Sequence, residues 1–134
     1  MHVASIMACF AYRRPHADDD NPVVFIHQST WQQKMLCCYG NMVTLMDATY
    51  RTNIYDLPLF VVSVPTNVGY VVVATAVITD ETSESVSTVL RTLSEWNPTW
   101  NPRYAMSDFS ESQISAFEAV FTGTSCCTRT LEFH

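Results

Sequence analysis

The sequence predicts one mixed α/β domain, in which three antiparallel strands are followed by a helix, a strand, a second helix and a last strand. Three runs rich in Val, Leu, Phe and Tyr follow one another at Met42–Thr52, Leu57–Val64 and Tyr70–Thr79. This composition and the turn residues between the runs are typical of strands. Beyond them, apolar residues recur at helical spacing. With 134 residues, 48% of them apolar and 15% charged, the chain is long and apolar enough for a core.

Charge and cysteine content narrow the function classes. The balance of 7 basic and 13 acidic residues gives a net charge of -6, which argues against a free-standing nucleic-acid-binding domain. No apolar run reaches the roughly 18 residues of a membrane-spanning helix, so we expect no membrane partner. The five cysteines fit neither a disulfide framework nor C-x-x-C spacing, which favours reduced thiols in an intracellular protein.

Residues 1–22 are predicted to be a leader or linker. The stretch "RRPHADDDNP" combines Pro with a charge run, and both discourage regular structure. The run Asp18–Asp20 is interpreted as solvated linker rather than a metal site, because nothing fixes three consecutive carboxylates toward one point. The domain is therefore predicted to span residues 23–134.

A strand and a short helix are predicted to open this domain. The strand is "VVFIHQ", and Ser29 or Thr30 is the expected N-cap of a helix that ends at Gly40. One apolar face of this helix is expected to contain Trp31, Met35 and Cys38 or Tyr39. Of Cys37 and Cys38, one is expected to face inward and one outward.

The middle of the chain is predicted to form an antiparallel meander and a helix. The three apolar runs are joined by "NIYD" and "PTNVG", which are too short for a parallel crossover. In "TSESVSTVLRTLSEW", Thr82 or Ser83 is the expected N-cap and Glu84 lies in the positive first turn. The apolar face of this helix consists of Val86, Val89, Leu90 and Leu93.

The last third is predicted to continue the sheet. Arg103–Phe109 follows a crossover helix, so it should lie parallel to the first strand of the meander, with its C-terminal end near Asp47. A capping box from Ser110 to Gln113 opens the next helix. Its apolar face is expected to contain Ile114, Phe117, Val120 and Phe121. The tail "SCCTRTLEFH" is predicted to form a last strand.

Two acids stand out, because each is a single carboxylate at the end of an apolar strand segment: Asp47 in "TLMDATY" and Asp108 in "AMSDFS". A carboxylate is rarely buried unless it is hydrogen-bonded or binds a cation. Mg²⁺ or Mn²⁺ would offset the repulsion between two such acids, and pairs of this kind serve two-metal phosphoryl transfer. Alternatively, Asp108 or Ser110 caps the next helix, and Asp47 is bonded to a turn.

The stretch from "LMDATYRTNIYD" to "RYAMSDFSESQISAFEAVF" resembles the transposase domain of Mutator-like elements (MULE). It is most similar to the ribonuclease-H-like domain shared with SWIM-type zinc-finger proteins, over roughly residues 23–123. In that family a "D-x-TY-x-T-N" element carries the first catalytic acid, which matches Asp47. An "M-[ST]-D" element carries the second, which matches Asp108, preceded by Met106 and Ser107.

The resemblance implies a ribonuclease-H-like, DDE-type transposase fold and a nuclear protein. In such enzymes three acids bind two Mg²⁺ or Mn²⁺ ions and cleave and join DNA strands. The third acid, a Glu, follows a helical insertion after the second, so we expect a C-terminally truncated domain that is inactive by itself. The family's C-x-x-H pair is also incomplete, because Leu131 stands where the Cys is expected, although His134 remains. Glu132 lies on the wrong side of the insertion to replace the third acid.

Other interpretations stay open. The chain could be a domesticated or decayed interaction module of a SWIM-type zinc-finger protein, or a ribonuclease-H-like nuclease acting on RNA–DNA hybrids. Trp96 and Trp100 could stack on bases, but aromatic residues beside a helix end more often close a core. His27 is interpreted as a surface or capping residue rather than a metal ligand.

Overall fold

The computed structural model describes residues 9–13, 23–49, 57–107, 111–121 and 127–130. These residues form one mixed sheet and three helices. The strands are β1 (Cys9–Arg13), β2 (Val23–Ser29), β3 (Val43–Thr49), β4 (Leu59–Thr66), β5 (Gly69–Ile78), β6 (Tyr104–Ser107) and β7 (Cys127–Thr130). The helices are α2 (Thr30–Tyr39), α3 (Ser83–Trp96) and α4 (Glu111–Val120).

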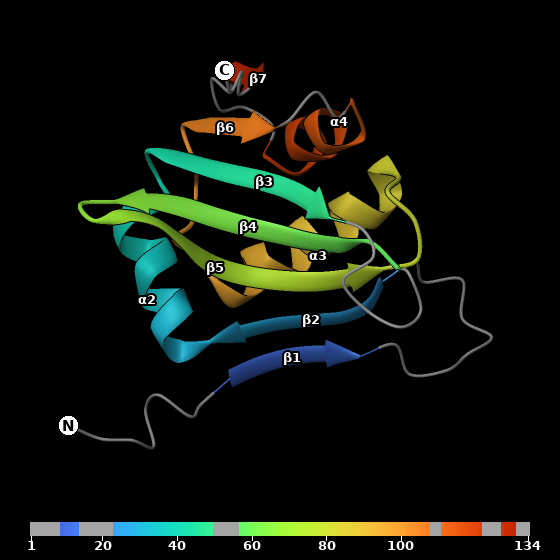
Figure 1. The fold of residues 1–134 in the computed structure, drawn as a ribbon, viewed down its shortest axis with the longest axis horizontal. Coiled ribbons are helices and arrows are strands. Elements are labelled where there is room, and N and C mark those ends of the chain that lie inside the picture. The colour runs from blue at the N-terminus through green and yellow to red at the C-terminus, as the bar shows by residue number, and fades with distance from the viewer. Residues whose placement is uncertain (1–8, 14–22, 50–56, 108–110, 122–126, 131–134) are drawn as a thin grey trace.

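The seven strands lie in the order β1-β2-β5-β4-β3-β6-β7 (Figure 1). β3, β4 and β5 form the predicted antiparallel meander. β6 pairs parallel with β3, as the right-handed crossover rule predicts, and β7 pairs parallel with β6. The tail strand is thereby confirmed too. The carboxyl ends of β3 and β6 consequently lie at the same end of the sheet.

The strand β1 lies inside the segment predicted to be a leader. It pairs antiparallel with β2, from Cys9 opposite Ser29 to Arg13 opposite Phe25. β2 in turn pairs antiparallel with β5. Regular structure therefore reaches further toward the N-terminus than the sequence indicated, because ladder hydrogen bonds do not depend on a strong apolar pattern. The placement of the domain boundary at residue 23 stays a prediction.

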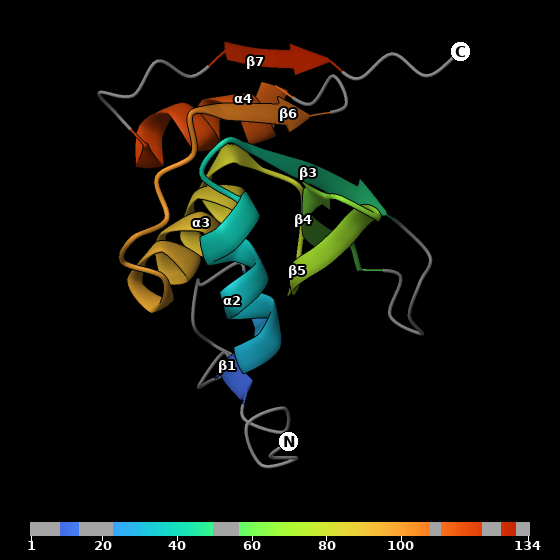
Figure 2. The ribbon, with the colours of Figure 1, turned by 90° about the vertical axis from the view of Figure 1, so that its left-hand side faces the viewer.

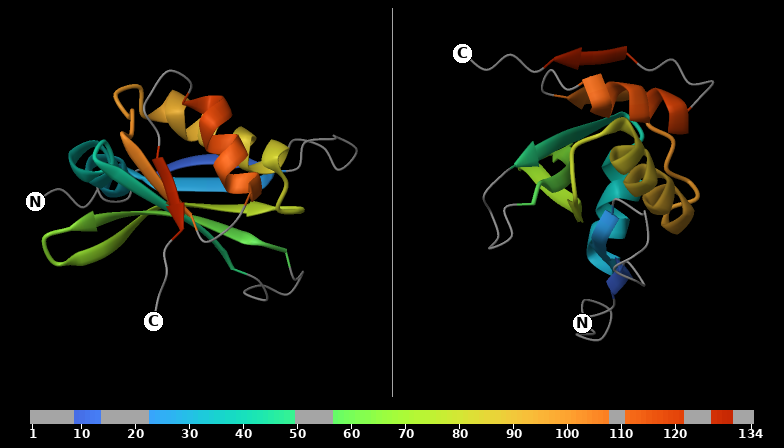
Figure 3. Two further views of the ribbon diagram at one scale, coloured as in Figure 1. Left: turned by 90° about the horizontal axis from the view of Figure 1, so that it is seen from above. Right: turned by 90° about the vertical axis from the view of Figure 1, so that its right-hand side faces the viewer.

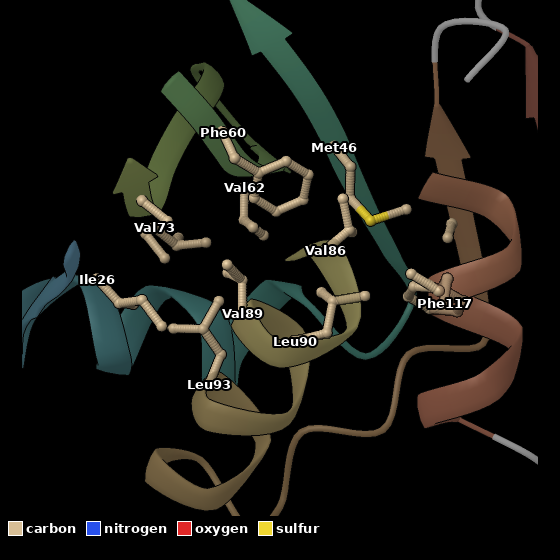
Figure 4. Packing of buried hydrophobic residues seen from close by; sticks show 14 of the residues in the cluster. Ile26, Met46, Phe60, Val62, Val73, Val86, Val89, Leu90, Leu93 and Phe117 are labelled. Carbon is tan, nitrogen blue, oxygen red and sulfur yellow. The ribbon is translucent and has the colours of Figure 1, made fainter. Parts of the chain in front are cut away.

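The core lies between one face of the sheet and the helices. Figures 2 and 3 show α2 and α3 on the same side of β3, β4 and β5. Alternate strand residues reach the α3 residues Val86, Val89, Leu90 and Leu93, as the helical periodicity predicted (Figure 4). The facing strand side chains are those of Ile26, Met46, Phe60, Val62 and Val73. Within the described ranges, no helix covers the opposite face of these strands.

The helix ends follow the predicted capping chemistry. Ser29 caps α2, because its hydroxyl accepts the Gln32 N–H at 3.1 Å and the Gln32 side chain accepts the Ser29 N–H at 2.9 Å. α2 ends before Gly40, as predicted. Thr82 caps α3 by accepting the Ser85 N–H at 3.2 Å. Both caps satisfy backbone donors that have no partner within the helix.

The predicted apolar face of α2 is right in part, because Met35 and Tyr39 are partly buried against the core. Leu36 is the residue of α2 that is buried, whereas Trp31 is 47% exposed. Cys37 and Cys38 are both exposed, so the prediction that one faces inward is wrong. The helix contains apolar residues on several sides, and therefore periodicity alone does not determine its orientation.

Trp100 closes the core beside the end of α3, as predicted. It is 3% exposed, its indole N–H donates to the Thr44 hydroxyl at 3.2 Å, and its ring meets Phe121 edge to face at 4.9 Å. Trp96 is half-buried against the same core. Among the described residues, no helix combines the length and apolar character needed to cross a bilayer.

Candidate functional site

Of the two predicted acids, Asp47 belongs to β3, and Asp108 directly follows Ser107, the last residue of the neighbouring strand β6. Asp47 is the fifth residue of β3 and pairs with Val61 of β4. On the other side of β3, Met46 pairs in parallel register with Ser107, the last residue of β6. Asp47 directly follows Met46 in the sequence, and Asp108 directly follows Ser107. The topology thus places Met46, which precedes Asp47, beside Ser107, which precedes Asp108, at one end of the sheet.

Asp47 is exposed, although it belongs to a strand of mostly apolar residues. Thr44 and Met46 point into the core, so Asp47 points to the face of the sheet that no described helix covers. Its Oδ1 accepts the N–H of Ala48 at 2.9 Å. A carboxylate in water needs no cation for its own stability, so burial provides no argument for a metal here.

Asp108 and Ser110 lie outside the described residues. The same holds for three residues that complete the first motif, Tyr50, Thr52 and Asn53. The alternative in which Asp108 or Ser110 caps α4 therefore lies outside the described residues as well. Asp47 lies inside β3 rather than at its end, and its described hydrogen bond is to the next residue of the strand.

The start of β6 is held against the turn that precedes β3. The Arg103 N–H donates to the Asn41 carbonyl at 2.9 Å, and the Tyr104 N–H donates to the Met42 carbonyl at 3.2 Å. The side chain of Asn41 also accepts the Asn101 N–H at 2.7 Å. These contacts fix the register in which Met46 and Ser107 become partners.

The end of β6 is held by a hydrogen-bonded chain of three polar side chains, two of them buried, that sequence reasoning missed. The Ser107 hydroxyl bonds to Oε1 of Gln113 in α4 at 2.5 Å, and Nε2 of Gln113 donates to Glu81 at 2.9 Å. Ser107 is 1% exposed and Gln113 is 2% exposed. The sequence offered one signal, because Gln113 is a polar residue within a helix of apolar character. The capping box predicted from Ser110 to Gln113 involves Ser110, which lies outside the described residues.

The remaining candidates contribute no ligand cluster to this region. Within the described ranges, no group of three or more His, Cys, Asp or Glu side chains is placed to hold a metal ion. His27 is half-buried and stacks on Phe25 at 6.2 Å between ring centroids. Asp18–Asp20 and the tail residues Leu131, Glu132 and His134 lie outside the described residues.

Comparison with known proteins places this arrangement in a family. Residues 43–131 match the MULE transposase domain, a range that runs from the first residue of β3 past the end of β7. No match was found among curated proteins or among solved structures. The matched range covers more than half of the chain and contains both predicted acids and the chain of polar side chains at the end of β6. The chain therefore belongs to the MULE transposase domain family.

Proposed function

We propose that this chain is the ribonuclease-H-like part of a DDE-type transposase, in which Asp47 and Asp108 bind Mg²⁺ or Mn²⁺ for DNA strand cleavage and joining. Membership of the MULE family supports the reaction class. The order of elements, an antiparallel meander followed by a crossover helix and a parallel strand, supports the fold.

The parallel register of β3 and β6 is the observation that carries the proposal. Met46 and Ser107 are partners on adjacent strands, which lie about 4.8 Å apart. Each is bonded to one of the acids, and bonded residues have Cα atoms about 3.8 Å apart. The Cα atoms of the two acids are therefore separated by no more than about 12 Å. Residues 61 positions apart in the sequence come this close only because the crossover places β6 beside β3.

The chemistry of the donors fits a hard divalent cation. Asp47 supplies an exposed carboxylate, and Mg²⁺ is usually held by one or two carboxylates while it keeps several waters. The divalent metal would activate the attacking oxygen and stabilise the leaving oxygen of a phosphodiester. The protein's own contribution is to hold Asp47 on a central strand, hydrogen-bonded to Ala48, in contact with solvent.

DNA is the proposed substrate and the nucleus the proposed location, both through the parent transposase. The net charge of -6 means that phosphate contacts would depend on bound cations and on basic surfaces beyond these residues. The resemblance implies a third acid, a Glu, which the two acids Asp47 and Asp108 do not replace. We therefore propose that they bind the metal without cleaving DNA. Metal-dependent nicking of a plasmid by the 134-residue chain, lost on Asp47→Ala, would contradict this part.

Calorimetric titration with Mg²⁺ and with Mn²⁺ tests the metal site. The unmodified chain is expected to bind, and Asp47→Asn and Asp108→Asn are each expected to weaken binding about tenfold or more, because a hard cation loses a charged ligand. Glu95→Gln, an exposed charge change on α3, is the control and should bind like the unmodified chain. Equal affinity in all four proteins would refute the site.

The acidic charge favours a second candidate, a domesticated interaction module of a SWIM-type zinc-finger protein that no longer handles DNA. It predicts that neither Asp47→Asn nor Asp108→Asn changes metal binding, since no ion would be held there. A ribonuclease-H-like nuclease shares the proposed fold, and cleavage of an RNA–DNA hybrid would distinguish it from a transposase.

A further inference from the structure

We infer that Gln113, oriented by Glu81, is a positioning residue for the metal site, because it fixes the end of β6 from which the chain continues into Asp108. This inference rests on the proposed function, since it assigns a role relative to the two acids. The residues that carry it, Ser107, Gln113 and Glu81, are all described, and they come from β6, α4 and the connection between β5 and α3.

The three side chains form a continuous hydrogen-bonded chain. Ser107 bonds to Oε1 of Gln113 at 2.5 Å, and Nε2 of Gln113 donates to Oε2 of Glu81 at 2.9 Å. The Gln113 side chain is almost wholly buried, next to the apolar residues Ala116 and Phe117 on the same helix. A buried amide costs free energy unless it is paired, so these bonds stabilise Gln113 in its buried position.

Glu81 determines which group of the Gln113 amide faces Ser107. An ionised carboxylate only accepts hydrogen bonds, so it must face the NH₂ group of the Gln113 amide. The amide oxygen is then turned toward Ser107, whose hydroxyl must donate. A neutral amide in place of Glu81 could meet Gln113 in either orientation. The charge of Glu81 therefore determines which group Ser107 meets, although the two residues belong to elements separated by the meander and α3.

The hydrogen-bonded side chains lie at the end of β6 that leads to the proposed metal ligand. The start of β6 is anchored by backbone bonds to Asn41 and Met42, at the far end from the acids. Ser107 is the last described residue of β6, and its side chain points into the core while the next residue carries the proposed ligand. The hydrogen bond to Gln113 therefore holds Ser107, the residue to which Asp108 is covalently bonded. Mutation of residues that orient metal ligands indirectly commonly lowers metal affinity by about 10–100-fold.

The test compares Glu81→Gln with Glu84→Gln. Both variants remove one carboxylate near the N-terminus of α3, where a negative charge interacts favourably with the helix dipole. Glu84, however, is exposed in the first turn of α3, and no described hydrogen bond joins it to Gln113 or Ser107. Ser107→Ala is the second variant, and it removes the hydroxyl group that bonds to Gln113. Urea unfolding of each protein provides the measure of global stability.

Two readouts separate positioning from general stability. Amide hydrogen exchange measured by NMR should be about tenfold faster at Met106 and Ser107 in Glu81→Gln and Ser107→Ala than in Glu84→Gln. Calorimetric Mn²⁺ affinity should fall by about tenfold in the same two variants and stay unchanged in Glu84→Gln. Exchange rates in Glu81→Gln and Ser107→Ala that equal those of Glu84→Gln would overturn the inference.

The two proposals fail in distinguishable ways. If the unmodified chain binds Mn²⁺ through Asp47 but Glu81→Gln and Ser107→Ala bind it equally well, the positioning role is wrong and the metal site stands. If the unmodified chain binds no Mn²⁺, the metal site is wrong and so is the role assigned to Gln113 relative to it. In that event faster exchange at Met106 and Ser107 would show only that the hydrogen bonds through Gln113 support β6.

Discussion

Helix α4 holds the polar chain in place through one aromatic side chain, and Phe117→Ala tests that support. Phe117 is fully buried, and it lies one turn after Gln113 on the same face of the helix. Its ring lies 4.7 Å from that of Phe121, which packs against Trp100 at 4.9 Å. Truncation at position 117 therefore opens a cavity between α4 and the rest of the core.

The expected loss of stability is about 3–5 kcal/mol, the usual cost of replacing a buried Phe by Ala. Domains of this kind are typically stable by about 5–15 kcal/mol, so the variant should still fold but unfold at lower temperature. The midpoint should fall by about 10–20 °C for a domain of this length. Phe117→Leu keeps most of the volume and loses mainly the aromatic pair, which contributes about 0.5–1.5 kcal/mol.

Urea unfolding followed by circular dichroism measures these differences. Ile114→Ala is the matched control, because Ile114 lies on the predicted apolar face of the same helix but is only half-buried. It should cost less than about 2 kcal/mol, since less apolar surface returns to water. A loss in Phe117→Ala no larger than that in Ile114→Ala would refute the packing described for α4.

Two further substitutions test the fold around the site. Ser29→Ala should lower stability by about 1 kcal/mol, because it removes the N-cap of α2 and its capping box, and an unchanged urea midpoint would contradict the cap. Asn97→Ala should cost about 1–3 kcal/mol, because the Asn97 amide donates to buried Gln28 at 2.8 Å and Gln28 would lose that donor. Stability equal to that of the unmodified protein in a thermal melt would show that this bond contributes nothing.

Much of the fold could be predicted from local sequence signals. The short connection "PTNVG" required antiparallel pairing, and Gly69 in it adopts φ 126, a conformation that residues with side chains rarely take. The caps Ser29 and Thr82 lie where their residue types indicated. The right-handed crossover rule then placed β6 beside β3. Each of these signals acts over a few residues or follows from chain connectivity.

The exposure of Asp47 could not be predicted, because β3 has apolar residues on both faces. Val43 and Leu45 share the side of Asp47, whereas Met46 is buried on the other side. Alternation with a period of two identifies which residues share a face, but here it does not identify the face that meets the helices. That choice depends on where α3 returns to the sheet, which is a property of the tertiary structure.

The contacts that link Ser107, Gln113 and Glu81 could not be predicted from the sequence either. Glu81 and Gln113 are 32 residues apart, and they meet because α3 and α4 pack beside each other. A capping box and a buried polar contact use the same residue types, so the sequence favoured the local interpretation of Gln113. Only the packing of α4 on β6 reveals the second partner.

Paramagnetic broadening by Mn²⁺ tests the central proposal most directly. Small amounts of Mn²⁺ added to the isotope-labelled chain broaden the amide signals nearest the bound ion. The amide signals of Met46, Asp47, Ala48 and Ser107 are expected to broaden first, and Asp47→Asn is expected to abolish this preference. Broadening centred on residues 80–84, or a pattern that Asp47→Asn leaves unchanged, would contradict a metal site at the ends of β3 and β6.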